Sequence, residues 1–318
     1  MYMFKYILKR LGLMLMTFSI IMIICFTLVK MLPITIDPVI GGDAKIMYEF
    51  LDSRGYFDPI PVQFFNYLKR IFVNGDFGVG TYMYKKQNVI EVLFSKLPPT
   101  VIINIFSSLF SVPLGISLGI FAALKKNKWQ DHFISTLVMV VISVPSFVYA
   151  FIIQYLLCFK LGWFEITMIE GTKYFEPEIF ASMIPAILCL SFGSIAGYCR
   201  FTRAELTEVL TSEFMLLART KGLTKGQATV RHALRNAMVP IFPSIIGEFI
   251  SVLSGSLIIE KIFAIPGIGG LYLESINLKD YDFFMVLSGF YIFIGLAAGI
   301  VIDLSYGFID PRIRMGAK

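Results

Sequence analysis

Six long apolar stretches divide the chain, and they restrict its fold more than any other feature. They cover residues 11–29, 101–124, 133–159, 184–198, 239–259 and 283–308. A bilayer core is about 30 Å thick and is crossed by roughly 20 apolar residues in a helix, because lipid offers no hydrogen-bond partner to an exposed backbone group. The fourth stretch is short unless its helix continues through Arg200. The pattern predicts an all-α polytopic membrane protein with six transmembrane helices.

The composition argues against a soluble domain and against a nucleic-acid-binding protein. Hydrophobic residues make up 57% of the chain and charged residues only 16%, which is more apolar surface than a soluble domain can bury. The net charge of +6 comes from lysines and arginines that lie mainly at the ends of apolar runs, not along one helix face. We therefore expect contact with membrane lipid and none with nucleic acid.

The charges in the short loops predict how the chain is oriented, because lysine and arginine of short loops stay on the cytoplasmic side. With the N terminus inside, the cytoplasmic segments hold Lys125, Lys126, Lys128, Arg200, Arg203, Arg219, Lys221, Lys225, Arg231, Arg235, Arg312, Arg314 and Lys318. The short outer loops carry Glu165, Glu170, Glu176, Glu178, Glu274, Asp280 and Asp282. Both termini are expected in the cytoplasm, and the protein is expected in the inner or plasma membrane of the cell.

This orientation divides the chain into four parts. Residues 1–30 form the cytoplasmic N terminus and the first span, and residues 31–100 form an extracytoplasmic cap segment. Residues 101–308 form a core of five transmembrane helices, and residues 309–318 form a cytoplasmic tail. The cap segment is too long for a structureless connection, and turn signals flank its helical pattern VQFFNYLKRIF. We expect a small, partly helical cap.

A polar, basic loop at residues 204–238 separates the fourth and fifth spans. Ser212 is expected to cap a short helix that begins at Glu213, and Gly222 supplies the permissive backbone that ends this helix. Thr224 and Gln227 have the spacing of a capping box. The loop is therefore predicted to contain a helix, a sharp turn and a second helix.

The second loop helix is expected to lie along the membrane surface. Pro240 and Pro243 lack backbone N–H groups, so we expect them to interrupt the helix at the entry to the fifth span. Ala218 keeps one face of the loop flat for a partner. The apolar side chains expected to enter a partner's groove are Phe214, Leu217 and Leu223. The alternative is a helix that binds only to the lipid surface.

Polar side chains inside two spans mark a candidate translocation path, because intramembrane charge is costly and usually faces a cavity or a partner. Glu248 lies deep in the fifth span, among serines at one-turn spacings, and the second span has a similar polar face. The candidate path residues are Asn104, Ser108, Ser244, Glu248 and Ser251. The alternatives are a protonated Glu248 bonded to a neighbouring helix, and serines used only for packing.

Two further backbone features concern the spans. Pro145 is expected to kink the third span, because it frees a carbonyl one turn back. The PGIGG turn after the fifth span is expected either to re-enter the membrane at the outer mouth as part of a gate or to be an ordinary outer turn.

The sequence does not point to catalysis by this chain. No G-x-x-x-x-G-K-[ST] phosphate-binding loop occurs, so the chain is not expected to hydrolyse ATP. His132 and His232 have no second ligand at metal spacing. A membrane hydrolase with Ser194 as nucleophile and His232 as base is the rival, but the loop position of His232 argues against it. A secondary transporter is a third possibility, although two related halves are not visible.

Several motifs resemble the B-type permease subunit of oligopeptide and dipeptide ABC importers. The run ARTKGLTKGQATVRHALRNAMVP resembles the cytoplasmic EAA loop of such permeases, and NGDFGVG, LPPT and SVPSF resemble the GDFG, LPxT and SxPxF motifs of this branch. EKIFAIPGIGGL resembles ExxFxxPGxG, and DPRIR matches the characteristic tail. The resemblance covers essentially the whole chain in order, and the motifs are specific together, not singly.

The resemblance implies a type I importer in which this chain forms half of the translocation path. A homologous C-type permease would form the other half. Two ATPase subunits would bind ATP and Mg²⁺ and dock on the cytoplasmic loop, and an extracytoplasmic binding protein would deliver peptide. This chain would bind no cofactor or metal of its own. Nickel or another small solute of the same branch is the alternative cargo.

The resemblance also implies two groups of site residues. The ATPase-coupling residues are Glu213, Phe214, Leu217, Ala218, Lys221, Gly222, Leu223, His232 and Asn236. The outer-gate residues are Glu260, Phe263, Pro266, Gly267 and Gly269. Leu216 and Leu217 stand where the general EAA motif has glutamate and alanine, so the ionic contact of that glutamate is not transferred to this chain. Gly80 and Lys261 also depart from the usual serine and threonine.

Overall fold

The computed structural model describes residues 2–32, 48–49, 52–53 and 55–309, and every named element in that part of the chain is helical. The chain forms two compact units, Met1–Ser95 with Leu271–Leu296, and Lys96–Gly270 with Ala297–Lys318. The DPRIR motif and the first turn signals of the cap segment, at residues 33–42, lie outside the described residues.

The helices confirm an all-α polytopic membrane protein. Within the described residues, the segments long and apolar enough to cross a bilayer are Tyr6–Lys30, Val89–Leu124, Pro177–Leu210, Lys225–Ser254 and Tyr281–Gly307. The pair Trp129–Ser143 and Ser146–Lys160 also qualifies by composition but is bent by 100°. The structure therefore has five spans, or six if the bent pair is one span.

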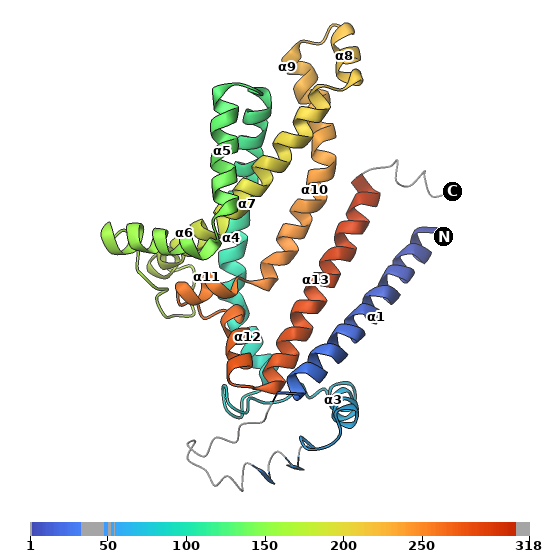
Figure 1. Ribbon diagram of the computed structural model, residues 1–318, viewed down its shortest axis with the longest axis vertical. Coiled ribbons are helices and arrows are strands. Elements are labelled where there is room, and N and C mark those ends of the chain that lie inside the picture. Colours follow the sequence, from blue (N-terminus) through green and yellow to red (C-terminus); the bar gives the residue numbers. More distant parts are fainter. Residues whose placement is uncertain (1, 33–47, 50–51, 54, 310–318) are drawn as a thin grey trace. The chain divides into compact units, whose positions relative to one another are not determined.

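The first unit packs the N-terminal span against a helix of the cap segment and the start of the last span. Its elements are α1 (Tyr2–Lys30), α3 (Ile60–Asn74), the start of α4 (Val89–Leu124), most of α12 (Ile268–Asn277) and the start of α13 (Tyr281–Ile309). Figure 1 shows the second half of α1, in blue, beside the first half of α13, in orange-red. The buried side chains that join these helices are Met22, Phe26, Val29, Tyr67, Tyr281 and Met285.

Within the first unit, α3 confirms the helical pattern expected in the cap segment. The helix begins after Pro59 and ends at Gly75, whose φ of 63° is in the left-handed region that glycine adopts without strain. Both residues belong to the turn signals of the sequence.

Two aspartates at the start of α13 hold the cap residues of the same unit. Asp280 Oδ2 accepts hydrogen bonds of 2.8, 2.8 and 3.0 Å from the backbone N–H groups of residues 81–83. Burial raises the pKa of the Asp280 carboxyl, and these three donors oppose the rise. Asp282 Oδ1 accepts a 2.6 Å hydrogen bond from Arg70 of α3. The acidic residues at the start of α13 therefore bind parts of the cap segment.

The second unit is built around one long helix. Its elements are the rest of α4, α5 (Trp129–Ser143), α6 (Ser146–Ile153), η1 (Gln154–Lys160), α7 (Pro177–Leu210), α8 (Glu213–Thr220), α9 (Lys225–Ala228), η2 (Thr229–Ala233), α10 (Leu234–Ser251), η3 (Val252–Ser254) and α11 (Leu257–Ile262). The central helix α7 packs against α5, α6 and α10 (Figure 1). It continues past Arg200 to Leu210, so the first residues of the expected loop are still helical.

The third predicted span is broken and not merely kinked. α5 ends at Ser143, Val144 is extended with φ −88° and ψ 126°, and α6 begins after Pro145. The proline ring clashes with a helical conformation of the preceding residue, which explains the extended Val144. The kink expected at Pro145 is therefore a bend of 100° between two separate helices.

The fifth span begins earlier than expected, and the predicted interruption at Pro240 is wrong. α9, η2 and α10 follow one another without a gap, and both Pro240 and Pro243 lie inside α10. The second loop helix is thus the first part of the span and not a separate surface helix. Its buried face packs on α7 through Ala228, Ala233, Ala237 and Leu206. This packing offsets the hydrogen bonds that the prolines remove.

Candidate functional site

The loop between α7 and α9 has the predicted order of helix, turn and second helix. After α8, the backbone reverses at Gly222, whose φ is 88°. Thr224 and Gln227 form the predicted capping box at the start of α9. The cap expected at Ser212 is wrong, because its hydroxyl donates to a carbonyl in the last turn of α7 and makes no cap hydrogen bond to α8.

The two faces of α8 have different surroundings. Met215 is buried, and Ala218 and Leu223 pack against the cluster of Ala123, Leu206, Ala228, Ala233 and Ala237. Ala218 and Leu223 therefore hold the loop to α7 and to the α9–α10 run, and both remain half-exposed. The other face exposes Phe214 by 39%, Leu216 by 61% and Leu217 by 56%. We call these three residues the α8 patch.

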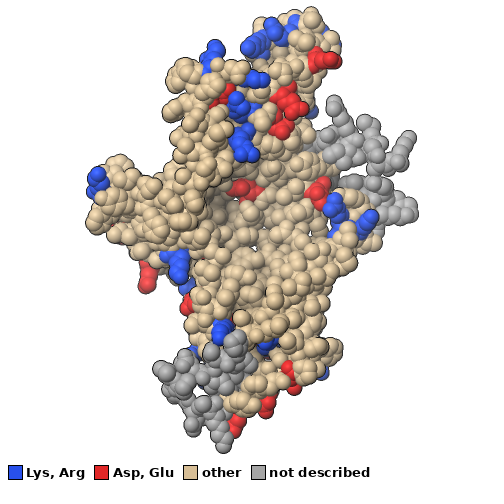
Figure 2. Space-filling view, in the orientation of Figure 1, with Lys and Arg blue, Asp and Glu red and all other residues tan. Residues whose placement is uncertain are grey.

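Polar and basic side chains are exposed on the same loop and on the helical run that follows it. Four of the coupling residues expected from the sequence are exposed here: Glu213, Lys221, His232 and Asn236. Figure 2 shows basic side chains, in blue, gathered at the tip where Figure 1 labels α8 and α9. The exposed basic residues are Arg219, Lys221, Lys225, Arg231 and Arg235. An apolar centre with a charged rim is the usual anatomy of a protein docking surface.

The segment that follows α10, from α11 to the PGIGG turn, is organised around the buried carboxylate of Glu260. α11 carries Glu260, whose side chain is fully buried. Glu260 Oε1 accepts a 2.9 Å hydrogen bond from the Thr100 hydroxyl, and Oε2 accepts a 2.8 Å bond from the N–H of Gly269. Thr100 Oγ1 in turn accepts from the N–H of Ile268 at 3.0 Å. This carboxylate therefore ties the LPPT segment of α4 to the PGIGG turn.

Two glycines leave room for the Glu260 carboxylate. A Cβ atom at Gly267 would collide with the carboxylate and with the Thr100 hydroxyl, and one at Gly269 would lie 2.8 Å from Glu260 Oε2. Burial raises the pKa of the Glu260 carboxyl, and the hydrogen bonds from Thr100 and from backbone N–H groups oppose the rise. The glycines of the PGxG pattern therefore have a specific physical role at this turn.

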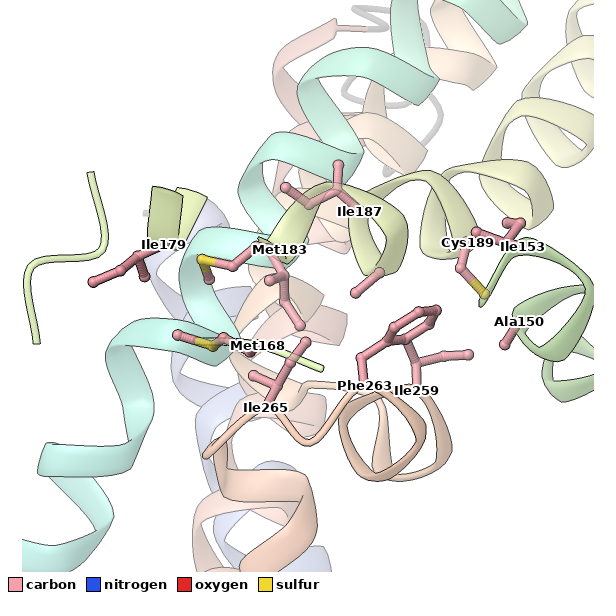
Figure 3. Close-up of a cluster of buried hydrophobic side chains, with 12 residues drawn as sticks. Ala150, Ile153, Met168, Ile179, Met183, Ile187, Cys189, Ile259, Phe263 and Ile265 are labelled. Carbon is pink, nitrogen blue, oxygen red and sulfur yellow. The ribbon is translucent and has the colours of Figure 1, made fainter. Parts of the chain in front are cut away.

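An apolar cluster holds the segment between α11 and the PGIGG turn. Phe263 is fully buried and, with Ile259, packs against α6 and α7. Figure 3 shows both side chains pointing into the cluster that contains Cys189 of α7 and Ala150 of α6. Pro266 is exposed. The structure thus brings four of the five expected gate residues into one buried group, and it adds Thr100, for which the LPPT motif is the sequence signal.

The expected path residues of α10 have mixed exposure. Ser244 and Glu248 are half-buried, and Ser251 is exposed. The Ser194 hydroxyl of α7 donates to Glu248 Oε1 at 2.7 Å. Glu248 therefore makes the hydrogen bond to a neighbouring helix that the sequence left as an alternative, while part of its surface stays accessible.

The expected path residues of α4 are less accessible. Asn104 is half-buried and donates from Nδ2 to the Thr100 carbonyl at 2.8 Å. Ser108 is only 4% exposed, and Ser107 is hydrogen-bonded to Ser191 of α7 at 3.1 Å. The serines of this span therefore pack between helices within the unit, and only Asn104 of the two expected path residues keeps an accessible surface.

A buried ion pair, which the sequence analysis did not identify, joins α5 to α7. Asp131 is 1% exposed, and its Oδ2 accepts bonds from Arg203 Nη2 at 2.8 Å and from the N–H of Asn127 at 2.9 Å. In the sequence, Arg203 is only one of many basic residues near the ends of apolar stretches. The sequence feature that could have predicted this ion pair is Asp131, because an acidic residue at the start of an apolar helix needs hydrogen-bond donors when it is buried.

The positions of Ser194 and His232 do not support the alternative of a membrane hydrolase. Ser194 donates to Glu248, and His232 is exposed on η2, so the two residues of the hydrolase alternative have different surroundings. Among the described residues, no three His, Cys, Asp or Glu side chains form a group that could hold a metal ion.

Comparison with known proteins agrees with the motifs. Residues 115–315 match the family described as binding-protein-dependent transport system inner membrane component. The chain is 35% identical to the dipeptide transport system permease protein DppB of Lactococcus lactis subsp. cremoris, over 98% of this chain and 100% of that protein. It is 30% identical to the glutathione transport system permease protein GsiC of Salmonella typhimurium, over 98% of this chain and 99% of that protein.

A solved structure shows the same fold. The crystal structure of an amino acid ABC transporter with histidines has a TM-score of 0.50 and 18% identity to this chain, over 68% of this chain and 92% of that one. The membrane-spanning helices, the loop that carries the α8 patch and the family match together establish that this chain belongs to the binding-protein-dependent transport system inner membrane components.

Proposed function

We propose that the chain is the B-type permease subunit of a peptide importer and forms half of its translocation path. A homologous permease forms the other half, two ATPase subunits bind ATP and Mg²⁺, and an extracytoplasmic binding protein delivers the peptide. The two termini and the α8 loop face the cytoplasm of a cell bounded by this membrane. The observation that carries the proposal is the α8 patch, an exposed apolar surface on a loop that also exposes basic residues, within the matched family region.

The packing of α8 gives a mechanism for the coupling. α8 is held through Met215, Ala218 and Leu223 to a cluster that contains residues of α7, α9, η2 and α10. A displacement of α8 by an ATPase therefore acts on two long helices at once. Because α9, η2 and α10 follow one another without a gap, the displacement is passed along this run into the membrane. The π-helical η2 and the prolines of α10 are the places where the run can bend.

Replacing Leu217 by aspartate tests the docking of the ATPase. Leu217 is 56% exposed, so the substitution leaves the buried cluster intact and places a charge in the centre of the α8 patch. We expect the ATPase to bind at least about 30-fold more weakly, as for a central interface residue worth about 2 kcal/mol. The measurement is ATPase affinity for the detergent-purified permease pair, followed by ATP-dependent peptide uptake into proteoliposomes.

The matched control is Val230→Asp, which places the same charge on an exposed apolar residue of η2, outside the α8 patch. Its ATPase affinity and uptake are expected to stay close to those of the unchanged chain. If Leu217→Asp and Val230→Asp bind the ATPase equally well, the α8 patch is not the docking surface.

Replacing Glu248 by leucine tests the translocation path. Glu248 is half-buried and partly satisfied by Ser194, so its remaining surface is free to meet a passing peptide. We expect peptide uptake to fall several-fold while peptide-independent ATP hydrolysis is retained. Ser194→Ala is the control, because it removes the hydrogen bond but keeps the carboxyl group. Uptake that falls equally in both variants would assign Glu248 to helix packing instead of the path.

A further inference from the structure

The first unit contains a cavity, lined by both apolar and charged side chains, that the transport cycle described above does not use. It has a volume of about 250 Å³ and lies where the end of α1 meets α3 and the start of α13. Its lining includes the aromatic rings of Phe26, Tyr56, Tyr67 and Tyr281, and the polar side chains of Lys30, Gln63, Asn66, Arg70, Asp76 and Asp282. The cavity is smaller than the roughly 300 to 1,000 Å³ typical of sites for drug-sized ligands. It has the size of a small polar group.

Lys30 presents a positive charge to this cavity. Its Nζ lies 3.6 Å from the centre of the Tyr56 ring, 4.5 Å from that of Tyr281 and 5.7 Å from that of Phe26. Among the described residues this nitrogen forms no ion pair. The carboxylate of Asp282, which is paired with Arg70, is near enough for its charge to act on the ammonium. Ring faces attract the ammonium charge but leave its N–H donors without acceptors. An anion in the cavity would supply those acceptors.

Two more polar atoms of the lining residues are buried without a partner. Arg70 donates from its terminal nitrogens to Asp282, but its Nε has no acceptor. Gln63 donates from Nε2 to the carbonyls of Tyr56 and Asp58, while its Oε1 has no donor. Buried polar atoms are normally satisfied, and each unsatisfied one is costly. Both atoms lie behind the surface of the cavity, so a bound polar group meets them only when the Arg70 or Gln63 side chain turns toward the cavity.

The position of Lys30 indicates where such an anion comes from. Lys30 ends the apolar span Tyr6–Lys30, so its ammonium lies at the level of the lipid head groups. The face of α1 that leads to Lys30 carries Met16, Ile20 and Ile23, which are 54%, 49% and 47% exposed. These residues precede Lys30 by 14, 10 and 7 positions, which places them on the same side of the helix. An acyl chain can lie along this face.

We propose that the cavity binds the head group of a membrane phospholipid whose phosphodiester is followed by a hydrogen-bond donor, such as phosphatidylglycerol. The phosphodiester lies at Lys30 and near Arg70, and one acyl chain follows Met16, Ile20 and Ile23. The Gln63 side chain turns toward the cavity, so that its Oε1 accepts from a head-group hydroxyl. The bound lipid joins α1 to α3 and α13 within the first unit. Phosphatidylcholine has no head-group donor, so it leaves Gln63 unsatisfied and binds more weakly.

Titration of the purified, assembled importer with phosphatidylglycerol, followed by native mass spectrometry, tests the proposal. We expect Lys30→Gln to weaken the tightest lipid-binding event about tenfold or more, as for the loss of a charge-assisted hydrogen bond. Lys30→Arg is expected to restore it. Lys160→Gln, which removes an exposed lysine at the end of the apolar helix η1, is expected to leave it unchanged.

A second pair of variants tests the lipid without altering the cavity. Ile23→Ser is expected to weaken phosphatidylglycerol binding several-fold, whereas Leu28→Ser, on the opposite side of α1 and 61% exposed, has no such effect. Soluble glycerol 3-phosphate and a tripeptide serve as competitors and are expected not to displace the lipid. Equal lipid affinity in Lys30→Gln and Lys160→Gln would overturn the proposal. Displacement by glycerol 3-phosphate alone would assign the cavity to free anions, and displacement by the tripeptide would assign it to the cargo.

Discussion

Glu260→Ala is expected to abolish peptide uptake and to destabilise the folded permease by about 2 to 6 kcal/mol. The substitution removes the acceptor of two buried donors, the Thr100 hydroxyl and the Gly269 N–H. Each buried donor left without a partner costs about 1 to 3 kcal/mol. Because these bonds tie α4 to the PGIGG turn, the turn also loses its defined position. The measurements are the melting temperature of the detergent-purified importer and ATP-dependent uptake into proteoliposomes.

Two variants make this experiment specific. Glu260→Gln keeps the size of the side chain and one carbonyl oxygen, so it is expected to lie between Glu260→Ala and the unchanged chain. Lys261→Ala changes the neighbouring residue, which is exposed, and is expected to have no effect on either measurement. The role of the carboxylate is refuted if Glu260→Ala melts and transports as Lys261→Ala does.

Asp131→Ala is expected to destabilise the permease by about 3 kcal/mol. Removing one partner of a buried ion pair leaves the other charge uncompensated, and the usual cost is about 3 to 5 kcal/mol. We use the lower end of this range because the Arg203 side chain is 33% exposed and its charge can be partly hydrated. The Asn127 N–H also loses its acceptor. The connection from α5 to α7 is therefore weakened at the end of α7 that leads to the α8 loop.

A double-mutant cycle separates this ion pair from a general loss of charge. The double variant Asp131→Ala with Arg203→Ala is expected to be less destabilised than the sum of the two single variants, because neither charge is left alone. Arg200→Ala, an exposed arginine on the same helix, is the control and is expected to be nearly neutral. If the decreases in melting temperature of the two single variants sum, within error, to the decrease of the double variant, Asp131 and Arg203 are not coupled.

The parts of the fold that depend on local sequence were predictable. The length and polarity of an apolar stretch decide whether it can cross a bilayer, so the spans could be located from sequence alone. The capping box of Thr224 and Gln227 and the turn at Gly222 were also predictable, because they depend on a few neighbouring residues. The same local reasoning failed at Pro240 and Pro243, where the packing of α10 on α7 outweighs the local preference of proline.

The sites were only partly predictable, since the partners of a buried polar group are distant in sequence. The motif pattern located Glu260, but its bond to Thr100 spans 160 residues of chain. The pair of Asp131 and Arg203 spans 72 residues and belongs to no motif in the sequence. On α8, the sequence located the helix but not its faces. Ala218 and, after the end of the helix, Leu223 are half-buried and pack against the cluster that contains Leu206.

The sequence by itself determined that this protein is a multi-pass helical membrane protein of the importer permease family, because span length, composition and ordered motifs are properties of the chain alone. Only the tertiary structure decided that Glu260 joins α4 to the PGIGG turn and that α8 presents Phe214, Leu216 and Leu217. The physical reason is that burial and hydrogen-bond partners arise from contacts between distant segments, and the free energy of those contacts exceeds local preference.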